Sequence, residues 1–131
     1  MGVVDRASLI AFLYTADMER CLHWYEDVLG LQERNRDDHG AELVVPGRPG
    51  AMIRVTALPA FNPSEHPVLG WNVPDLSPVE RQLREAGVRF TVYDGMGQNE
   101  NGVWTSPDGK TRLAWFPDPD GNILMLTQAA A

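Results

Sequence analysis

An internal repeat constrains this chain of 131 residues more than any other feature. In each half, one expected strand is followed by a helix and then by further strands separated by turns. Asp17 and Gly30, the expected limits of the first helix, are 13 positions apart, and Asp75 and Gly87 in the second half are 12 apart. Such repeats arise when a unit cannot cover its own sheet face and needs a twin. The sequence therefore predicts an α+β fold built from two βαβββ modules.

The first module is expected over residues 7–58. Residues 7–15 are almost all apolar and predict a strand. Apolar residues then recur every three or four positions from Met18 to Leu29, which predicts an amphipathic helix with Asp17 as its N-cap and Gly30 as its C-terminal stop. The remaining strands of this module are expected at 31–36, 41–45 and 52–58.

The second module repeats the plan over residues 67–128, after a proline-containing linker at 59–66. Its first strand is expected at 67–73. The sequence Ser77-Pro78-Val79-Glu80 predicts a capping box with proline at the first helical position, and Gly87 ends that helix. Closing strands are expected at 89–93, 103–104, 111–116 and 123–127. The whole chain, 1–131, is expected to be one domain of two halves.

Composition excludes several classes of function. Eleven basic residues against 18 acidic ones give a net charge of −7, which argues against a nucleic-acid-binding surface. No segment approaches the roughly 18 apolar residues of a membrane span, and the first residues lack the apolar core of a signal peptide. We therefore expect a cytoplasmic protein with no membrane partner. Cys21 lies in the apolar stripe of the first helix and predicts a buried, inert thiol.

Two segments resemble the vicinal oxygen chelate superfamily, which contains glyoxalases, extradiol dioxygenases and bleomycin-resistance proteins. Residues 17–31, DMERCLHWYEDVLGL, look like the first helix of that superfamily, and residues 115–122, WFPDPDGN, look like its final hairpin. The resemblance implies that the two modules form a duplicated, partly open barrel-like sheet with an apolar cleft. It also implies a homodimer, with the cleft either within one chain or between two.

Enzymes of this superfamily carry metal ligands on the first and last strands of each module. The resemblance places these positions at Ile10, Val55, Val68 and Met125. Zinc, magnesium and manganese prefer oxygen or imidazole ligands, which these side chains do not offer. The three histidines are expected on a helix, in a turn and in the linker, without a carboxylate at ligand spacing. We therefore expect no metal and no other cofactor.

Strand alternation extends these four positions to a candidate ligand site. If Ile10 faces the cleft, Ser8, Phe12 and Tyr14 share its face, while Leu9, Ala11 and Leu13 face the helices. His66 has the parity of Val68, and Trp104 follows a glycine-rich segment at 94–102 that is a candidate lid. By the same alternation, Ile53 accompanies Val55, Gly70 and Asn72 accompany Val68, and Ile123 and Thr127 accompany Met125. The candidate ligand-binding residues are Ile10, Phe12, Tyr14, Val55, His66, Val68, Trp104 and Met125.

An apolar, aromatic cleft is typical of a pocket for a small organic ligand. The leading hypothesis is a metal-independent small-molecule-binding protein, similar in kind to the bleomycin-resistance proteins, that sequesters an antibiotic or another planar or cationic compound. One alternative is a lyase, isomerase or dioxygenase-like enzyme, with a relocated metal or with metal-free acid–base chemistry at His66 or Tyr14. Another is a protein–protein interaction module whose cleft is filled by side chains. The sequence leaves open whether a reaction is catalysed.

Overall fold

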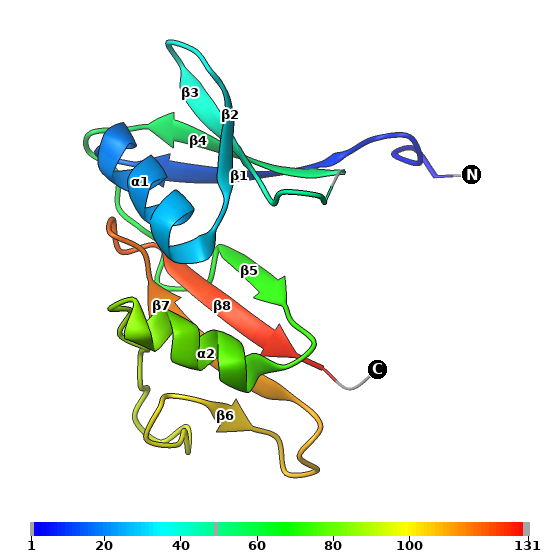
Figure 1. Cartoon of the computed structure of the whole chain (residues 1–131), viewed down its shortest axis with the longest axis vertical. Coiled ribbons are helices and arrows are strands. Elements are labelled where there is room, and N and C mark those ends of the chain that lie inside the picture. Colours follow the sequence, from blue (N-terminus) through cyan, green and yellow to red (C-terminus); the bar gives the residue numbers. More distant parts are fainter. Residues whose placement is uncertain (1, 49, 130–131) are drawn as a thin grey trace. The chain divides into compact units, whose positions relative to one another are not determined.

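The computed structural model describes residues 2–48 and 50–129. The chain divides into two compact units, residues 1–61 and 62–131. Each unit contains a four-stranded mixed sheet with one helix (Figure 1). This confirms the predicted α+β fold of two βαβββ modules.

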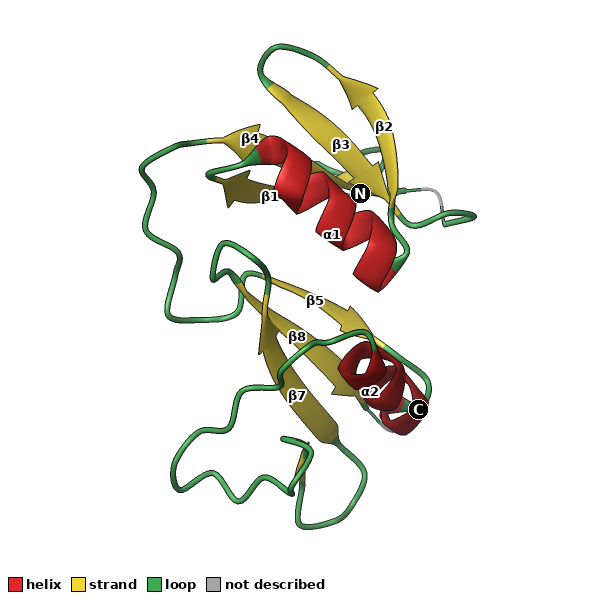
Figure 2. Ribbon diagram, turned by 60° about the vertical axis from the view of Figure 1, so that its left-hand side comes forward, coloured by secondary structure: helices red, strands yellow, loops and turns green. Residues whose placement is uncertain are grey.

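In the first unit, helix α1 covers one face of the sheet (Figure 2). The strand order is β1-β4-β3-β2, with β1 parallel to β4 and the other pairs antiparallel. Because β1 and β4 are parallel, the last strand of the module lies beside the first and leaves β1 at an edge of the sheet. The elements are β1 (Leu9–Thr15), α1 (Met18–Leu29), β2 (Gln32–Arg36), β3 (Gly40–Val44) and β4 (Ala51–Ala57).

Helix α1 begins and ends where the sequence predicts. The Asp17 carboxylate accepts a hydrogen bond of 3.2 Å from the backbone N–H of Arg20, which satisfies one of the free donors of the first turn. Gly30 ends the helix with φ at 73°, a left-handed conformation that glycine adopts without steric cost. The buried side of the helix packs on the sheet and completes the core of this unit. That core includes Leu13, Cys21, Leu22, Tyr25, Leu43 and Val55.

The second unit repeats this topology, with strand order β5-β8-β7-β6 and β5 parallel to β8. Helix α2 lies over the side of the sheet where Leu124 and Leu126 are buried. The elements are β5 (Leu69–Asn72), α2 (Leu76–Glu85), β6 (Trp104–Thr105), β7 (Arg112–Pro117) and β8 (Ile123–Gln128).

The predicted capping box at the start of α2 is wrong. Asp75 is the N-cap, with its carboxylate 3.4 Å from the backbone N–H of Ser77, so the helix begins two residues earlier and Pro78 occupies its third position. Glu80 does not reach back to the N-terminus, because its carboxylate is buried and pairs with Arg84 one turn later, at 2.8 Å. The repeat spacing, which begins the helix at Asp75, gives the correct start.

The strand predicted at 89–93 is also absent. The backbone N–H of Thr91 donates to the carbonyl of Trp115 at 2.8 Å, but no ladder follows. The next candidate donor, the N–H of Tyr93, bonds instead to the side chain of Gln98 at 2.6 Å. A side-chain acceptor therefore replaces the strand partner that a ladder requires.

Candidate ligand-binding site

The sheet of the first unit has one face against α1 and one open face, and the register between β1 and β4 assigns side chains to each. Ile10, Phe12 and Tyr14 pair with Met52, Arg54 and Thr56, and paired residues of a parallel ladder point to the same side. Ile10, Phe12 and Tyr14 are between 41% and 62% exposed. The open face therefore carries three candidate ligand-binding residues on β1, as predicted by alternation.

Val55 does not belong to this face, and its predicted placement is wrong. It pairs with Leu13, and both side chains are buried against the α1 side, Val55 at 0% exposure. Ile53 lies on the same buried side. In the second unit Gly70 pairs with Met125, and in the first unit Phe12 pairs with Arg54 at the corresponding place. The counterpart of Met125 is therefore Arg54.

The four positions that correspond to the superfamily's metal ligands do not fit a metal ion. With Arg54 in place of Val55, the set is Ile10, Arg54, Val68 and Met125, which offers two hydrocarbons, a cation and a thioether. A guanidinium carries no free lone pair and repels a cation. Within residues 2–48 and 50–129, no three His, Cys, Asp or Glu side chains are grouped closely enough to hold a metal ion.

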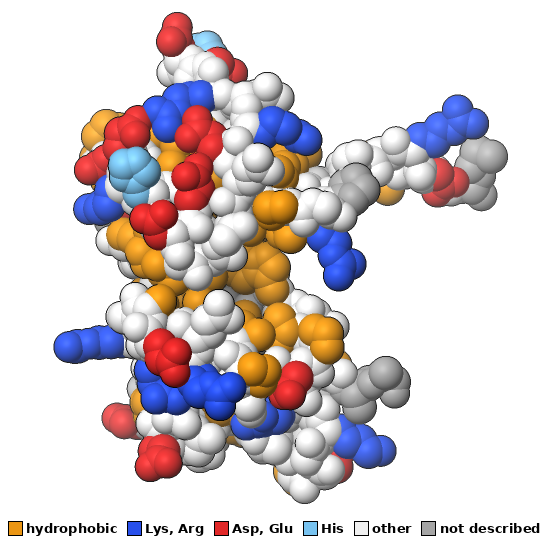
Figure 3. Space-filling view, viewed as in Figure 1, with side chains coloured by type: hydrophobic (Ala, Val, Ile, Leu, Met, Phe, Trp, Pro, Cys, Tyr) orange, Lys and Arg blue, Asp and Glu red, His pale blue; other side chains and the backbone are white. Residues whose placement is uncertain are grey.

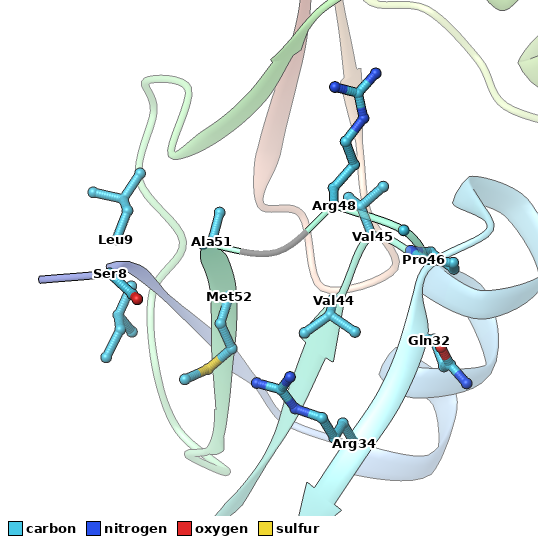
Figure 4. Close-up of a pocket in the computed structure, with 13 residues that line it drawn as sticks. Ser8, Leu9, Gln32, Arg34, Val44, Val45, Pro46, Arg48, Ala51 and Met52 are labelled. Carbon is cyan, nitrogen blue, oxygen red and sulfur yellow. The ribbon is translucent and has the colours of Figure 1, made fainter.

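A hollow of about 560 Å³ lies at one end of the open face of the first unit (Figure 4). Ile10, Val44 and Met52 supply apolar walls, and the turn after β3 forms one rim. In that turn the N–H of Arg48 donates to the carbonyl of Val45 at 3.0 Å, and proline precedes a glycine with φ at 76°, which is typical of a type II turn. The described lining residues are Ser8, Leu9, Ile10, Gln32, Arg34, Val44, Val45, Pro46, Gly47, Arg48, Gly50, Ala51 and Met52.

The polar groups of the open face are organised around Glu42 on β3. Its Oε1 atom accepts from Nε of Arg34 at 3.3 Å and from Nδ2 of Asn35 at 3.2 Å. Asn35 has φ at 52° and lies where the β2–β3 register shifts, so β2 contains a bulge. The bulge turns the next side chain, Arg36, toward Glu33 and toward Glu19 of α1. It thereby leaves Arg34 as the β2 cation that lines the hollow.

A second ion pair lies beside the first. Nη2 of Arg54 is 3.1 Å from Oδ1 of Asp37, which also accepts backbone hydrogen bonds from His39 and Gly40. The His39 N–H, the Arg54 guanidinium and the Gly40 N–H all favour the ionised carboxylate and hold the pKa of Asp37 below its usual range. Asp37 thus partly neutralises the positive charge of Arg54 on the open face.

The open face of the second unit is more apolar. Val68, Gly70 and Asn72 accompany Met125 and Thr127 on it, as the alternation predicts. A hollow of about 320 Å³ lies here, lined by Pro67, Val68, Leu69, Gly70, Trp71, Asn72, Met125 and Thr127. A Cβ at position 70 would stand 2.7 Å from the carbonyl oxygen of Met125, so glycine permits the close approach of β5 to β8 at its floor.

Trp104 lies on the same sheet but does not line this hollow. It pairs with Leu113, at the β6 edge of the sheet, and β7 and β8 separate it from β5. The preceding segment, a candidate lid, is tied to its neighbours by Gln98. Its side chain donates to the carbonyls of Thr91 and Gly102, at 2.8 and 2.7 Å, and accepts from Tyr93.

The remaining candidate, His66, is exposed in the linker and lines neither hollow. Of the eight predicted residues, the structure places Ile10 in the larger hollow and Val68 and Met125 in the smaller one, each within its own unit. Arg34 and Arg48 were not predicted. Alternation along β2, where Gln32 and Arg34 share a face, carries the signal for Arg34, whereas Arg48 lies in a turn that has no such period.

Acidic and basic side chains are mixed over α1, and basic side chains gather over α2 on the face shown in Figure 3. Among the described residues, no helix combines the length and the apolar character that crossing a membrane requires.

Comparison with known proteins gives a family. The model of the Glyoxalase/Bleomycin resistance protein/Dioxygenase superfamily matches residues 6–126. No curated protein matches the sequence.

Solved structures give the same fold. A member of the Glyoxalase/bleomycin resistance protein/dioxygenase superfamily from Sphaerobacter thermophilus is 21% identical, with a TM-score of 0.73 over 96% of this chain and 99% of that one. A bleomycin resistance determinant encoded on the transposon Tn5 is 24% identical, with a TM-score of 0.69 over 93% of this chain and 97% of that one. A glyoxalase/bleomycin resistance protein/dioxygenase from Nocardioides is 20% identical, with a TM-score of 0.66 over 99% and 87%.

Proposed function

This chain belongs to the Glyoxalase/Bleomycin resistance protein/Dioxygenase superfamily, and from that membership we propose that it binds a small organic molecule without a resident metal ion. The hollow on the open face of the first unit is the observation that carries the proposal. Its volume of about 560 Å³ falls within the range of sites for small ligands, and it combines apolar walls with a few polar groups.

Metal independence is supported by the side chains at the superfamily's ligand positions. Ile10, Val68 and Met125 offer no oxygen or imidazole, and the fourth position carries Arg54, whose charge opposes a bound cation. The ligand is therefore expected to be held by apolar contact and by polar side chains. Sequestration of an antibiotic or another planar compound is the form of binding that we propose, in a cytoplasmic protein.

We also propose that the protein is a homodimer. Strand β1 lies at an edge of its sheet and exposes a row of three apolar side chains on the open face, Ile10, Phe12 and Tyr14, of which Phe12 is 62% exposed. Contiguous exposed apolar area of this kind is typical of an interaction surface. A second copy of the chain is the partner that we expect to cover Phe12 and Tyr14, which do not line the hollow.

The test is a calorimetric titration of the protein with a panel of planar anions, neutral compounds and cations. Each titration is carried out on untreated protein and on protein treated with a chelator. We expect at least one compound to bind equally to both samples, and mass spectrometry of the recovered compound to show an unchanged mass. Loss of binding after chelation, with recovery on addition of zinc or manganese, would contradict metal independence. A panel in which nothing binds would contradict the binding function itself.

A further inference from the structure

The lining of the larger hollow differs in charge from the rest of the chain. The protein carries a net charge of −7, but the described residues that line the hollow include two arginines, Arg34 and Arg48, and no carboxylate; the Glu42 carboxylate, outside the lining, contacts Arg34 only at Nε. An acidic protein attracts cations at long range, whereas over a few ångströms the nearest charges dominate because salt screens the distant ones. The hollow therefore favours a ligand of the opposite charge to the one that overall composition suggests.

Arg34 is the better placed of the two cations. Its Nε–H faces Glu42, while no described residue forms a hydrogen bond with its two terminal nitrogens. Figure 4 shows its guanidinium pointing toward Met52, past Val44. The side chain is 56% exposed, so the terminal nitrogens are accessible to a ligand. Two parallel N–H groups in one plane match the two oxygens of a carboxylate.

The apolar walls beside this guanidinium define the rest of the ligand. Ile10, Val44 and Met52 lie on three different strands of the open face and line the same hollow as Arg34. Arg48 lies in the turn at the rim, and Figure 4 shows its side chain extending away from Arg34 and Met52. A ligand with an apolar body and one anionic end fills such a site, since each part then meets its matching surface.

We propose that the hollow on the open face of the first unit binds an organic anion with an apolar, planar body, and that Arg34 holds its carboxylate or an equivalent anionic group. This proposal rests on the proposed binding function and adds the charge of the ligand. It also assigns a role to Glu42 on β3, whose carboxylate competes with the ligand for the guanidinium of Arg34.

The experiment uses three probes that share one ring system: 2-naphthoate, 2-naphthamide and 2-naphthylmethylammonium. Each is titrated calorimetrically into the full chain, and the methyl resonances of Val44 and Met52 are followed by NMR. We expect naphthoate to bind at least tenfold more tightly than the other two probes, which corresponds to about 1.4 kcal/mol. We also expect it to shift both sets of methyl resonances.

Four variants separate a specific guanidinium contact from overall charge. We expect Arg34→Gln to weaken naphthoate at least tenfold and to leave naphthamide within twofold, and Glu42→Gln to leave naphthoate binding as tight as in the unmodified protein or tighter. The double variant R34Q/E42Q has the original net charge yet should bind naphthoate as weakly as Arg34→Gln. Arg81→Gln, on the exposed side of α2, removes one positive charge elsewhere and should have no effect.

Three results would overturn the proposal: naphthoate affinity restored in R34Q/E42Q, equal binding of all three probes, or naphthoate binding without a shift at Val44 and Met52. In each of these results the chain still binds a small molecule, so the proposed function survives while the anion site does not. If none of the probes and no compound of the wider panel binds, both fail. Circular dichroism of each variant shows whether it is folded.

Discussion

Arg54 on β4 and Asp37 in the turn after β2 form a two-point contact, with Nη2 of Arg54 at 3.1 Å from Oδ1 and 3.2 Å from Oδ2 of Asp37. The same carboxylate accepts from the backbone N–H groups of His39 at 2.7 Å and Gly40 at 2.9 Å. One side chain thus fixes the β2–β3 turn and joins it to β4. The His39 hydrogen bond is the largest cause of the lowered pKa of Asp37, followed by Arg54.

The lowered pKa makes the contribution of Asp37 to stability depend on pH. A carboxyl whose pKa is lower in the folded than in the unfolded chain stabilises the fold above the unfolded value, about 3.9, and this stabilisation is lost as the pH falls through the lowered value. Asp37→Asn should therefore lower the urea midpoint at neutral pH, with a difference that shrinks as the pH falls below about 4. Asp38→Asn, next in sequence and exposed, should show no such difference. A loss that is the same at every pH would contradict this reading of the turn.

Val55 should behave as a core residue. Truncating it to alanine removes two buried methyl groups from the side of the sheet that packs on α1, and we expect a loss of about 2 kcal/mol in the free energy of unfolding. Val92→Ala makes the same chemical change at a side chain that is 61% exposed, and should change stability by less than about 0.5 kcal/mol. Urea denaturation measures both. Equal effects of the two substitutions would show that Val55 is not a core residue and would support its placement on the open face.

The backbone at Asn35 gives a prediction about the bulge in β2. Its φ of 52° suits glycine and asparagine but strains a β-branched residue. Asn35→Gly and Asn35→Val both remove the hydrogen bond to Glu42, so the difference between the two isolates the backbone cost. We expect the valine variant to be less stable than the glycine variant by about 1–3 kcal/mol. Equal stability by urea denaturation would show that the left-handed conformation is not required.

The repeat predicted the two modules and the start of each helix, because capping residues, glycine stops and apolar periods are local signals. The repeat gave a wrong result at Val55, where the face of the sheet to which the side chain points was inferred from residue spacing alone. In the strand ladders Arg54 holds the place that corresponds to Met125, whereas the sequence analysis assigned that place to Val55, one residue later. A shift of one residue reverses the face, which is why Val55 was expected in the cleft.

The arginines of the hollow show a different limit of the sequence. Arg34 lies on β2, and its importance depends on the pairing of β2 with β3 and on a bulge at Asn35 that turns Arg36 to the other side. Pairing between strands is a tertiary property, and no glycine or proline marks the bulge. The first and last strands of the module therefore predict the apolar walls of the hollow, but they do not predict the positive charge of Arg34.

Gln98 should control the order of the segment before Trp104. Its side chain makes three hydrogen bonds of 2.6 to 2.8 Å with the backbone of Thr91, Tyr93 and Gly102. Gln98→Leu leaves these backbone groups without their partner, and we expect the amide of Tyr93 to exchange with solvent at least tenfold faster. The amide of Leu126, in the sheet, should be unaffected. Gln82→Leu, on the exposed side of α2, is the matched control, and equal exchange at Tyr93 in both variants would show that Gln98 does not hold the segment.

The exposed apolar row on β1 gives the test of the proposed homodimer. Phe12 is 62% exposed and lies in the middle of the strand, between Ile10 and Tyr14. A carboxylate buried in an interface without a partner is strongly unfavourable, so Phe12→Glu should convert the dimer to a monomer in sedimentation equilibrium. Val92→Glu places the same charge at an equally exposed apolar residue of the second unit and should leave the dimer intact. A wild-type chain that sediments as a monomer would contradict the proposed homodimer. A Phe12→Glu variant that still dimerises would show that the interface lies elsewhere on the chain.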